Sequence, residues 1–264
     1  MKYIFKVVKV VLGTFLSFFL VLFLFIVFAP VHNPNMQNTN LNNSDDIKPF
    51  SLSQSDITYY DKSNSSGSNL KNTNTSSTFI KAVLTRAVAM TEVKWIPKYN
   101  LIDKKGMFIF IKGKTYYGVP YSMDSYQVRS PDDFLSKINN SDTLYGNDCS
   151  GFVSAAWDIP RQTTLSLYNA LKNGTKIDGK SIEKESWNEL QSADALLLDD
   201  GKGNGHIMLY IDCDKKNSDN LNVYEQNIPT IIPFEPIPVA RKDIRSKSKL
   251  ISEGYIPIRL IVNS

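Results

Sequence analysis

Hydrophobic and polar residues fall into long blocks along this chain, beginning with an almost continuously apolar block over residues 10–29. Twenty residues of helix span about 30 Å, which is the thickness of the hydrocarbon core of a bilayer. Lys2, Lys6 and Lys9 precede the block, and the next charged residue is Asp45. Basic residues mark the cytoplasmic end of a membrane helix. We therefore expect a cytoplasmic segment over residues 1–9, a single-pass transmembrane anchor over residues 10–29, and export of everything that follows.

The same apolar block also fits a cleaved signal peptide, which would release the protein from the cell. Signal peptides have an apolar region of about 7–15 residues and a cleavage site of small residues. This block is longer and ends in Phe28-Ala29-Pro30. The pattern therefore favours a retained anchor over secretion.

Residues 30–77 are rich in Asn, Ser, Thr and Asp and contain few clustered apolar residues. Such a segment cannot bury enough apolar surface to offset the entropy lost on ordering. We expect a disordered linker with a mean span of about 40 Å. A folded domain should then occupy residues 78–264.

Apolar periodicity within residues 78–264 alternates between helical and extended spacing. Helical spacing predominates in the first half and strand patterns in the second, which predicts an α+β domain with an antiparallel sheet. Helices are expected over residues 79–95, 149–159 and 164–172, short extended pieces over 107–111 and 115–117, and strands over 195–198, 206–211, 221–226 and 255–262.

Charge and cysteine content narrow the possible functions. Without the three lysines before residue 10, 27 basic residues stand against 26 acidic ones, so the exported part gives no reason to expect a nucleic-acid partner. Cys149 and Cys213 admit one disulfide, but an exported domain of this size does not need one. One usable histidine and two distant cysteines form no metal-ligand cluster, so we expect neither a metal nor another cofactor.

Cys149 and His206 are the strongest candidates for chemistry. Cys149 follows the turn residues Gly146-Asn147-Asp148 and opens a helix, where the helix dipole and unpaired N–H groups favour a thiolate. His206 opens an apolar strand, and a thiol nucleophile requires such a base. The alternative is that the small residues around Cys149 only pack the start of the helix.

An imidazole base works only when a neighbouring group fixes its tautomer. Strand residues alternate faces, so Glu225 and Asn227 lie on one side of their strand and Tyr224 and Gln226 on the other. We expect Glu225, ahead of Asn227, to orient His206. The alternative is a solvated strand edge that carries polar residues.

Taken together, the motifs of residues 79–262 resemble those of two related groups of papain-like cell-wall enzymes, the NlpC-type cysteine peptidases and the CHAP amidohydrolases. Asp-Cys-Ser-Gly with a downstream Gly-His strand is the specific part of this resemblance. The segment Glu225-Gln226-Asn227 is more similar to the CHAP group. The segments that carry the resemblance are Gly118-Val119-Pro120-Tyr121, Asp148-Cys149-Ser150-Gly151-Phe152, Pro160-Arg161, Ala193-Asp194, Gly205-His206-Ile207 and Glu225-Gln226-Asn227.

The resemblance implies a papain-like α+β fold and cleavage of amide bonds in peptidoglycan stem peptides or cross-links. It implies that Cys149 is the nucleophile, His206 the base and Glu225 or Asn227 the orienting residue. By the same resemblance, substrate contacts fall to Tyr121, Asp148 and Ser150. Tyr121 fits a half-buried core position equally well, and Asp148 fits a helix cap.

Two positions depart from the family pattern. The glycine usual before the aspartate is Ala193, and the second histidine often found at the third catalytic position of NlpC-type enzymes is missing. Two other functions stay open: a catalytically silent wall-binding module of the same fold, and a papain-like amidase or transferase acting on another amide. Within peptidoglycan, the sequence does not separate a stem-peptide endopeptidase from an N-acetylmuramoyl-L-alanine amidase.

Overall fold

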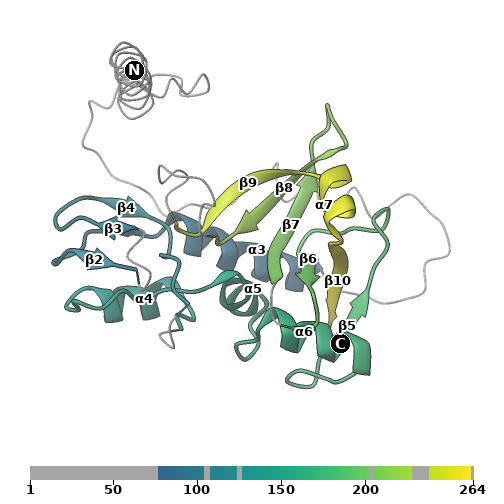
Figure 1. Cartoon of the computed structure of the whole chain (residues 1–264), viewed down its shortest axis with the longest axis horizontal. Helices are drawn as coiled ribbons and strands as arrows, with labels where there is room; N and C mark the ends of the chain where they lie inside the picture. The colour runs from purple at the N-terminus through teal and green to yellow at the C-terminus, as the bar shows by residue number, and fades with distance from the viewer. Residues whose placement is uncertain (1–76, 104–107, 124–126, 203–204, 228–237, 263–264) are drawn as a thin grey trace, which may run out of the picture. The chain divides into compact units, whose positions relative to one another are not determined.

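The computed structural model describes residues 77–103, 108–123, 127–202, 205–227 and 238–262 (Figure 1). The expected cytoplasmic segment, anchor and nearly all of the expected linker lie outside the described residues. Within the described residues, no helix combines the length and the apolar character needed to cross a membrane.

A six-stranded antiparallel sheet forms the centre of the domain, with the strand order β5-β10-β6-β7-β8-β9 (Figure 1). The strands expected around residues 195–198, 206–211, 221–226 and 255–262 are confirmed as β6, β7, β8 and β10. The bounds of the six strands are β5 Ser181–Lys184, β6 Ala195–Asp199, β7 Gly205–Cys213, β8 Asn220–Glu225, β9 Arg241–Ser246 and β10 Ile256–Ile261.

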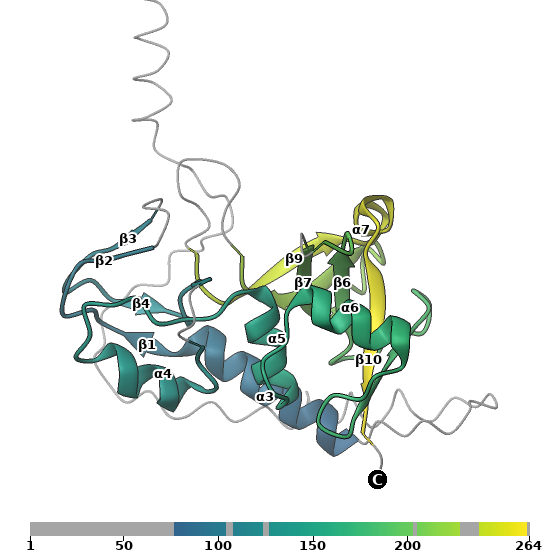
Figure 2. The ribbon, with the colours of Figure 1, turned by 60° about the horizontal axis from the view of Figure 1, so that its bottom comes forward.

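Helices α3, α5 and α6 pack on one face of this sheet, and α7 packs beside β9 (Figure 2). Alternate residues of the central strands serve two cores. Leu197 and Ile207 lie in the core that includes α5, whereas Leu196 and Met208 lie in a second cluster with Leu250 of α7. The helices are α3 Ser77–Glu92, α4 Pro131–Ile138, α5 Cys149–Trp157, α6 Thr164–Asn173 and α7 Lys247–Glu253.

Two short antiparallel ribbons precede the sheet in the chain. They pair β1 (Lys94–Trp95) with β4 (Tyr116–Tyr117) and β2 (Leu101–Ile102) with β3 (Ile109–Phe110). The helix expected over residues 79–95 therefore ends earlier than expected, at Glu92. The Trp95 indole packs against three aromatic rings and donates a hydrogen bond to the Gly118 carbonyl, and these tertiary contacts override the apolar spacing.

The α+β class with an antiparallel sheet is confirmed. α5 is capped by Asp158, two residues before Pro160, and α6 is capped by Gly174 in the left-handed conformation. Both helices thus end where the sequence placed a stop. Helices α4 and α7 and strands β1, β2, β5 and β9 were not expected. Both cysteines are free, with Cys149 buried and Cys213 exposed.

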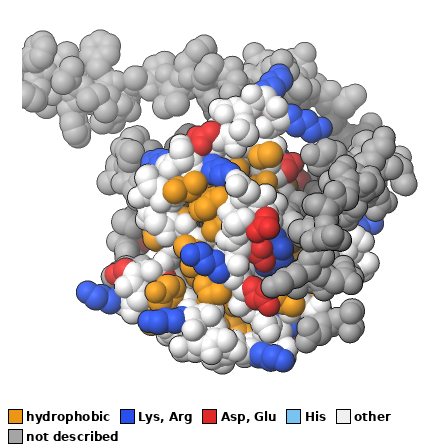
Figure 3. Space-filling model, turned by 90° about the vertical axis from the view of Figure 1, so that its right-hand side faces the viewer, with side chains coloured by type: hydrophobic (Ala, Val, Ile, Leu, Met, Phe, Trp, Pro, Cys, Tyr) orange, Lys and Arg blue, Asp and Glu red, His pale blue; other side chains and the backbone are white. Residues whose placement is uncertain are grey.

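Figure 3 shows the face of the domain that lies to the right in Figure 1. Acidic and basic side chains are interspersed there among small apolar areas. This mixture of signs agrees with the near balance of acidic and basic residues in the sequence after residue 9.

Ala193 has a backbone conformation that L-amino acids avoid. Its φ is 76°, and its carbonyl accepts a hydrogen bond of 2.8 Å from the Trp157 indole while its N–H donates to the Tyr210 carbonyl. A left-handed residue with a Cβ costs about 1–2 kcal/mol. The structure thus explains why glycine, the usual residue of the family pattern, suits the position that Ala193 occupies in this chain.

We expect Ala193→Gly to leave the free energy of unfolding within about 1 kcal/mol of the wild-type value, because relief of strain offsets a lost buried methyl worth about 0.8 kcal/mol. Ala156, fully buried in α5, is the matched control. Its glycine variant loses a methyl and about 1 kcal/mol of helix propensity, so it should be about 2 kcal/mol less stable. Urea denaturation measures both, and equal losses would mean that Ala193 stores no strain.

Candidate active site

Cys149 is the first residue of α5 and is 8% exposed. The Asp148 side chain caps the helix by accepting a hydrogen bond of 2.6 Å from the Gly151 N–H. A Cβ on Gly151 would lie 2.5 Å from Gln127 Oε1 and 3.0 Å from Asp148 Oδ1, so only glycine lets the cap close this tightly. The thiol is therefore held at the positive end of a helix dipole.

Asp148 and Ser150, both expected to contact substrate, are occupied within the protein. The Asp148 carboxylate pairs with Arg161 in addition to capping α5. The Ser150 hydroxyl donates a hydrogen bond of 3.1 Å to Asp148 and is almost completely buried. Their contacts fit a role in shaping the start of α5. For Asp148 this is the helix-capping role that the sequence analysis gave as the alternative to substrate binding.

His206 lies at the start of β7, and its side chain is 15% exposed. Nε2 lies 3.4 Å from Glu225 Oε2. The Cys149 thiol is near enough to raise the pKa of His206. A Cβ on the preceding Gly205 would lie 2.2 Å from the Leu198 carbonyl oxygen, so glycine allows β7 to approach β6 here. Cys149, His206 and Glu225 thus interact across α5, β7 and β8.

The charge state of His206 follows from these neighbours. Burial disfavours the imidazolium and lowers the pKa of His206, but hydrogen bonds and charge interactions with Cys149 and Glu225 outweigh burial and raise that pKa to about 9. His206 is therefore an imidazolium at neutral pH and holds a proton that it can donate.

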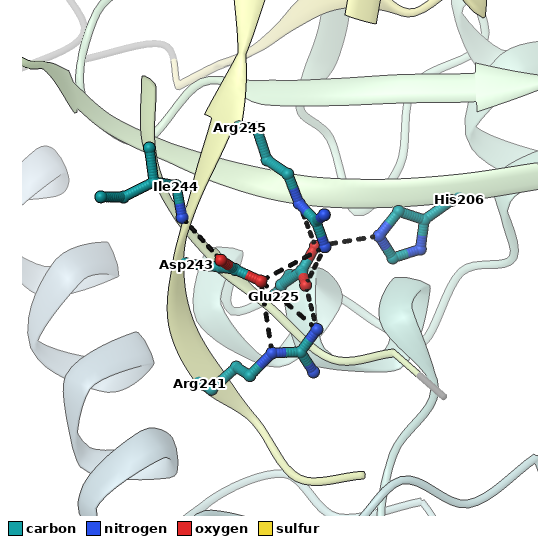
Figure 4. Close-up of polar contacts among 6 residues, drawn as sticks. All are labelled: His206, Glu225, Arg241, Asp243, Ile244 and Arg245. Carbon is teal, nitrogen blue, oxygen red and sulfur yellow. Dashed lines mark hydrogen bonds and ion pairs between the residues drawn. The ribbon is translucent and has the colours of Figure 1, made fainter. Parts of the chain in front are cut away.

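Glu225, the last residue of β8, has no exposed side-chain area. Both of its carboxylate oxygens accept hydrogen bonds from Arg245, and Oε1 also accepts one from Arg241 (Figure 4). Burial alone would raise the pKa of Glu225, but the contacts with His206, Arg241 and Arg245 lower it to about 2. Glu225 is thus a carboxylate throughout the physiological pH range.

Asn227, the second candidate for orienting His206, follows the end of β8 and is half-buried. The side chain that contacts His206 Nε2 is that of Glu225. The geometry therefore favours Glu225 over Asn227 as the orienting group, in the order that the sequence analysis gave them.

Tyr121 lies beside the segment that leads into α5. Its backbone pairs with Asn147, and its N–H donates a hydrogen bond of 2.7 Å to the Pro238 carbonyl. Burial raises the pKa of the half-buried Tyr121 phenol, and the nearby Cys149 and Asp148 raise it further. Tyr121 therefore carries a neutral hydroxyl close to the thiol, and that hydroxyl can donate a hydrogen bond.

The sequence analysis did not identify four residues that lie at the site. Arg241 and Arg245 hold Glu225, and the Tyr255 ring lies edge-on to His206 with centroids 6.4 Å apart. Buried Gln226 donates through Nε2 to the carbonyls of Val119 and Pro120, next to Tyr121. The sequence signal for the arginines was weak, because alternating charges on a strand also fit a solvated edge.

Within the part of the chain that the structure describes, no group of three or more His, Cys, Asp and Glu side chains is arranged to hold a metal ion. Comparison of the chain with protein-family models, with curated proteins and with solved structures finds no match. The contacts at the site therefore carry the functional argument.

Glu225→Gln should lower the free energy of unfolding at pH 7 by about 1–3 kcal/mol, because it leaves two partly buried guanidiniums without their carboxylate. The pKa of Glu225 is depressed in the folded state from 4.5 to about 2. Its contribution is fully present above pH 4.5 and is lost as the pH falls through about 2. The difference between wild type and variant in urea denaturation should narrow over that range, and a constant difference would contradict the ionised state of Glu225.

Proposed function

We propose that this chain is a membrane-anchored, extracytoplasmic cysteine hydrolase with a papain-like domain, which cleaves amide bonds in peptidoglycan stem peptides or cross-links. One observation carries the chemistry: Cys149, at the start of a helix, interacts with His206, which in turn contacts the buried carboxylate of Glu225. A nucleophile, a base and an orienting acid in contact are what acyl transfer requires.

In the first half of the reaction, the Cys149 thiolate attacks the carbonyl carbon of the amide. The N–H of Cys149, at the open first turn of α5, and the hydroxyl of Tyr121 stabilise the oxyanion. The His206 imidazolium donates its proton to the leaving nitrogen, the C–N bond breaks, and the amine departs. The product is a thioester on Cys149 beside a neutral imidazole.

In the second half, His206 takes a proton from water, and the resulting hydroxide attacks the thioester carbonyl. The C–S bond breaks, the carboxylic acid product leaves, and the thiolate–imidazolium pair is restored. Glu225 keeps its negative charge throughout, so it stabilises the imidazolium without accepting its proton.

The choice of peptidoglycan as substrate rests on two features of the sequence. The motifs around Cys149 and His206 resemble those of cell-wall hydrolases, and the apolar block at residues 10–29 is expected to hold the domain outside the membrane on a linker. Both features favour a wall peptide over an intracellular or lipid amide.

Cys149→Ala should reduce the release of fragments from purified peptidoglycan at least a thousand-fold, because it removes the nucleophile. The fold should persist, since the change removes one sulfur atom. Mass spectrometry of the fragments identifies which amide bond the wild-type protein cuts, and Cys213→Ala is the matched control. Undiminished release by the Cys149 variant would refute the proposal, and release of a different product class would favour an amidase or transferase.

A silent wall-binding module of the same fold makes a different prediction for the thiols. In an active enzyme, iodoacetamide at pH 7 should alkylate buried Cys149 faster than exposed Cys213, because His206 lies near the Cys149 thiol and can act as its base. His206→Gln should remove that advantage. Peptide mapping by mass spectrometry gives both rates, and faster labelling of Cys213 in the wild type would support the silent module.

A further inference from the structure

Three charged residues of β9 converge on Glu225. Arg241, Asp243 and Arg245 are spaced two apart, so they share one face of the strand. Glu225 pairs with Arg241 in the β8–β9 register, and the side chain of Asp243 lies 3.4 Å from both arginines (Figure 4).

These four side chains have no net charge, since two guanidiniums balance two carboxylates. Arg245 reaches both oxygens of Glu225, Arg241 reaches one of them, and the side chain of Asp243, which is 33% exposed, offsets the second guanidinium. His206 lies against this neutral group, 3.4 Å from Glu225. The imidazolium therefore feels a carboxylate whose charge is already largely compensated.

We propose that Arg241, Asp243 and Arg245 form a charge clamp on Glu225, which fixes the carboxylate behind His206 and sets how strongly it attracts the imidazolium. The three are positioning residues that act through Glu225, and their role in hydrolysis rests on the function proposed above. The clamp itself makes a claim about His206 that holds whether or not Cys149 is a nucleophile.

A purely structural role would give a different arrangement. Stability alone does not require buried ion pairs, because apolar side chains of similar volume serve as well or better. Here the ionic group stands directly behind the one imidazole of the described domain, and its net charge depends on single residues. Removing either guanidinium leaves a net negative group beside His206, whereas removing the Asp243 charge leaves a net positive one.

Other groups also face His206 and remain constant in this comparison. Cys149 approaches from the start of α5, and Tyr255 packs on the ring from the residue before β10. Both arginines act through Glu225 on β8. If removing a positive side chain and removing a negative one shift the titration midpoint of His206 in opposite directions, the effect is therefore specific to the clamp.

The test is the NMR titration of His206 in the full-length protein in detergent. The chain has two histidines, so His32→Gln leaves one imidazole signal. Cys149→Ala in the same background removes the coupled thiol, so that the midpoint belongs to His206 alone. Arg245→Gln should raise this midpoint by about one pH unit and Asp243→Asn should lower it by about the same amount.

Two controls separate charge from packing. Arg245→Lys keeps the positive charge and should leave the midpoint near that of the background protein. Arg259→Gln breaks another buried ion pair, which joins β10 to Asp194 just before the start of β6. His206 pairs with Leu198 near the other end of β6, so this variant should lower the stability without moving the midpoint.

Shifts of opposite sign for Arg245→Gln and Asp243→Asn support the clamp. Shifts of the same sign, or no shift in variants that retain the native far-UV and NMR spectra, overturn it. If Arg245→Gln fails to fold, the downward shift in Asp243→Asn decides, since that side chain is partly exposed. Loss or retention of peptidoglycan cleavage in Cys149→Ala tests the proposed function separately.

Discussion

The half of the domain that holds Cys149 and His206 depends on the burial of a single carboxylate. Glu225 is fully buried at the end of β8, and a buried charge is tolerated only when it is paired and hydrogen-bonded. That requirement explains why β9, an edge strand, has a sequence dominated by charged residues: Arg241 and Arg245 are there to neutralise Glu225. The orientation of His206 follows from the same pairing.

The residue after Glu225 ties the rest of the site to the same strand end. Gln226 points to the other side and donates to the carbonyls of Val119 and Pro120. The Pro120 carbonyl also accepts from the N–H of Asn147, which leads into α5, and the adjacent Tyr121 pairs with that residue. The end of β8 therefore contacts His206 on one side and positions the segment that leads to Cys149 on the other.

The sequence predicted those parts of this arrangement that depend on local signals. Turn residues before Cys149 and the apolar run after His206 placed a helix start and a strand, and alternation along β8 put Glu225 in reach. It missed β9, because a strand whose side chains pair with a buried acid shows no apolar alternation. Whether Asp148 capped a helix or bound substrate was also undecidable, since both roles require the same residue type.

Residues 78–264 contain no second histidine, and this explains the presence of Arg241 and Arg245. A neutral imidazole in the third position would need no counter-charge when buried. A buried glutamate in that position does need a counter-charge. Without it, burial would raise the pKa of the glutamate until the carboxylate could take the proton from His206. Two guanidiniums keep Glu225 a weak base, and Asp243 prevents them from repelling the imidazolium. The choice of an acid at the third position thus accounts for the whole charged face of β9.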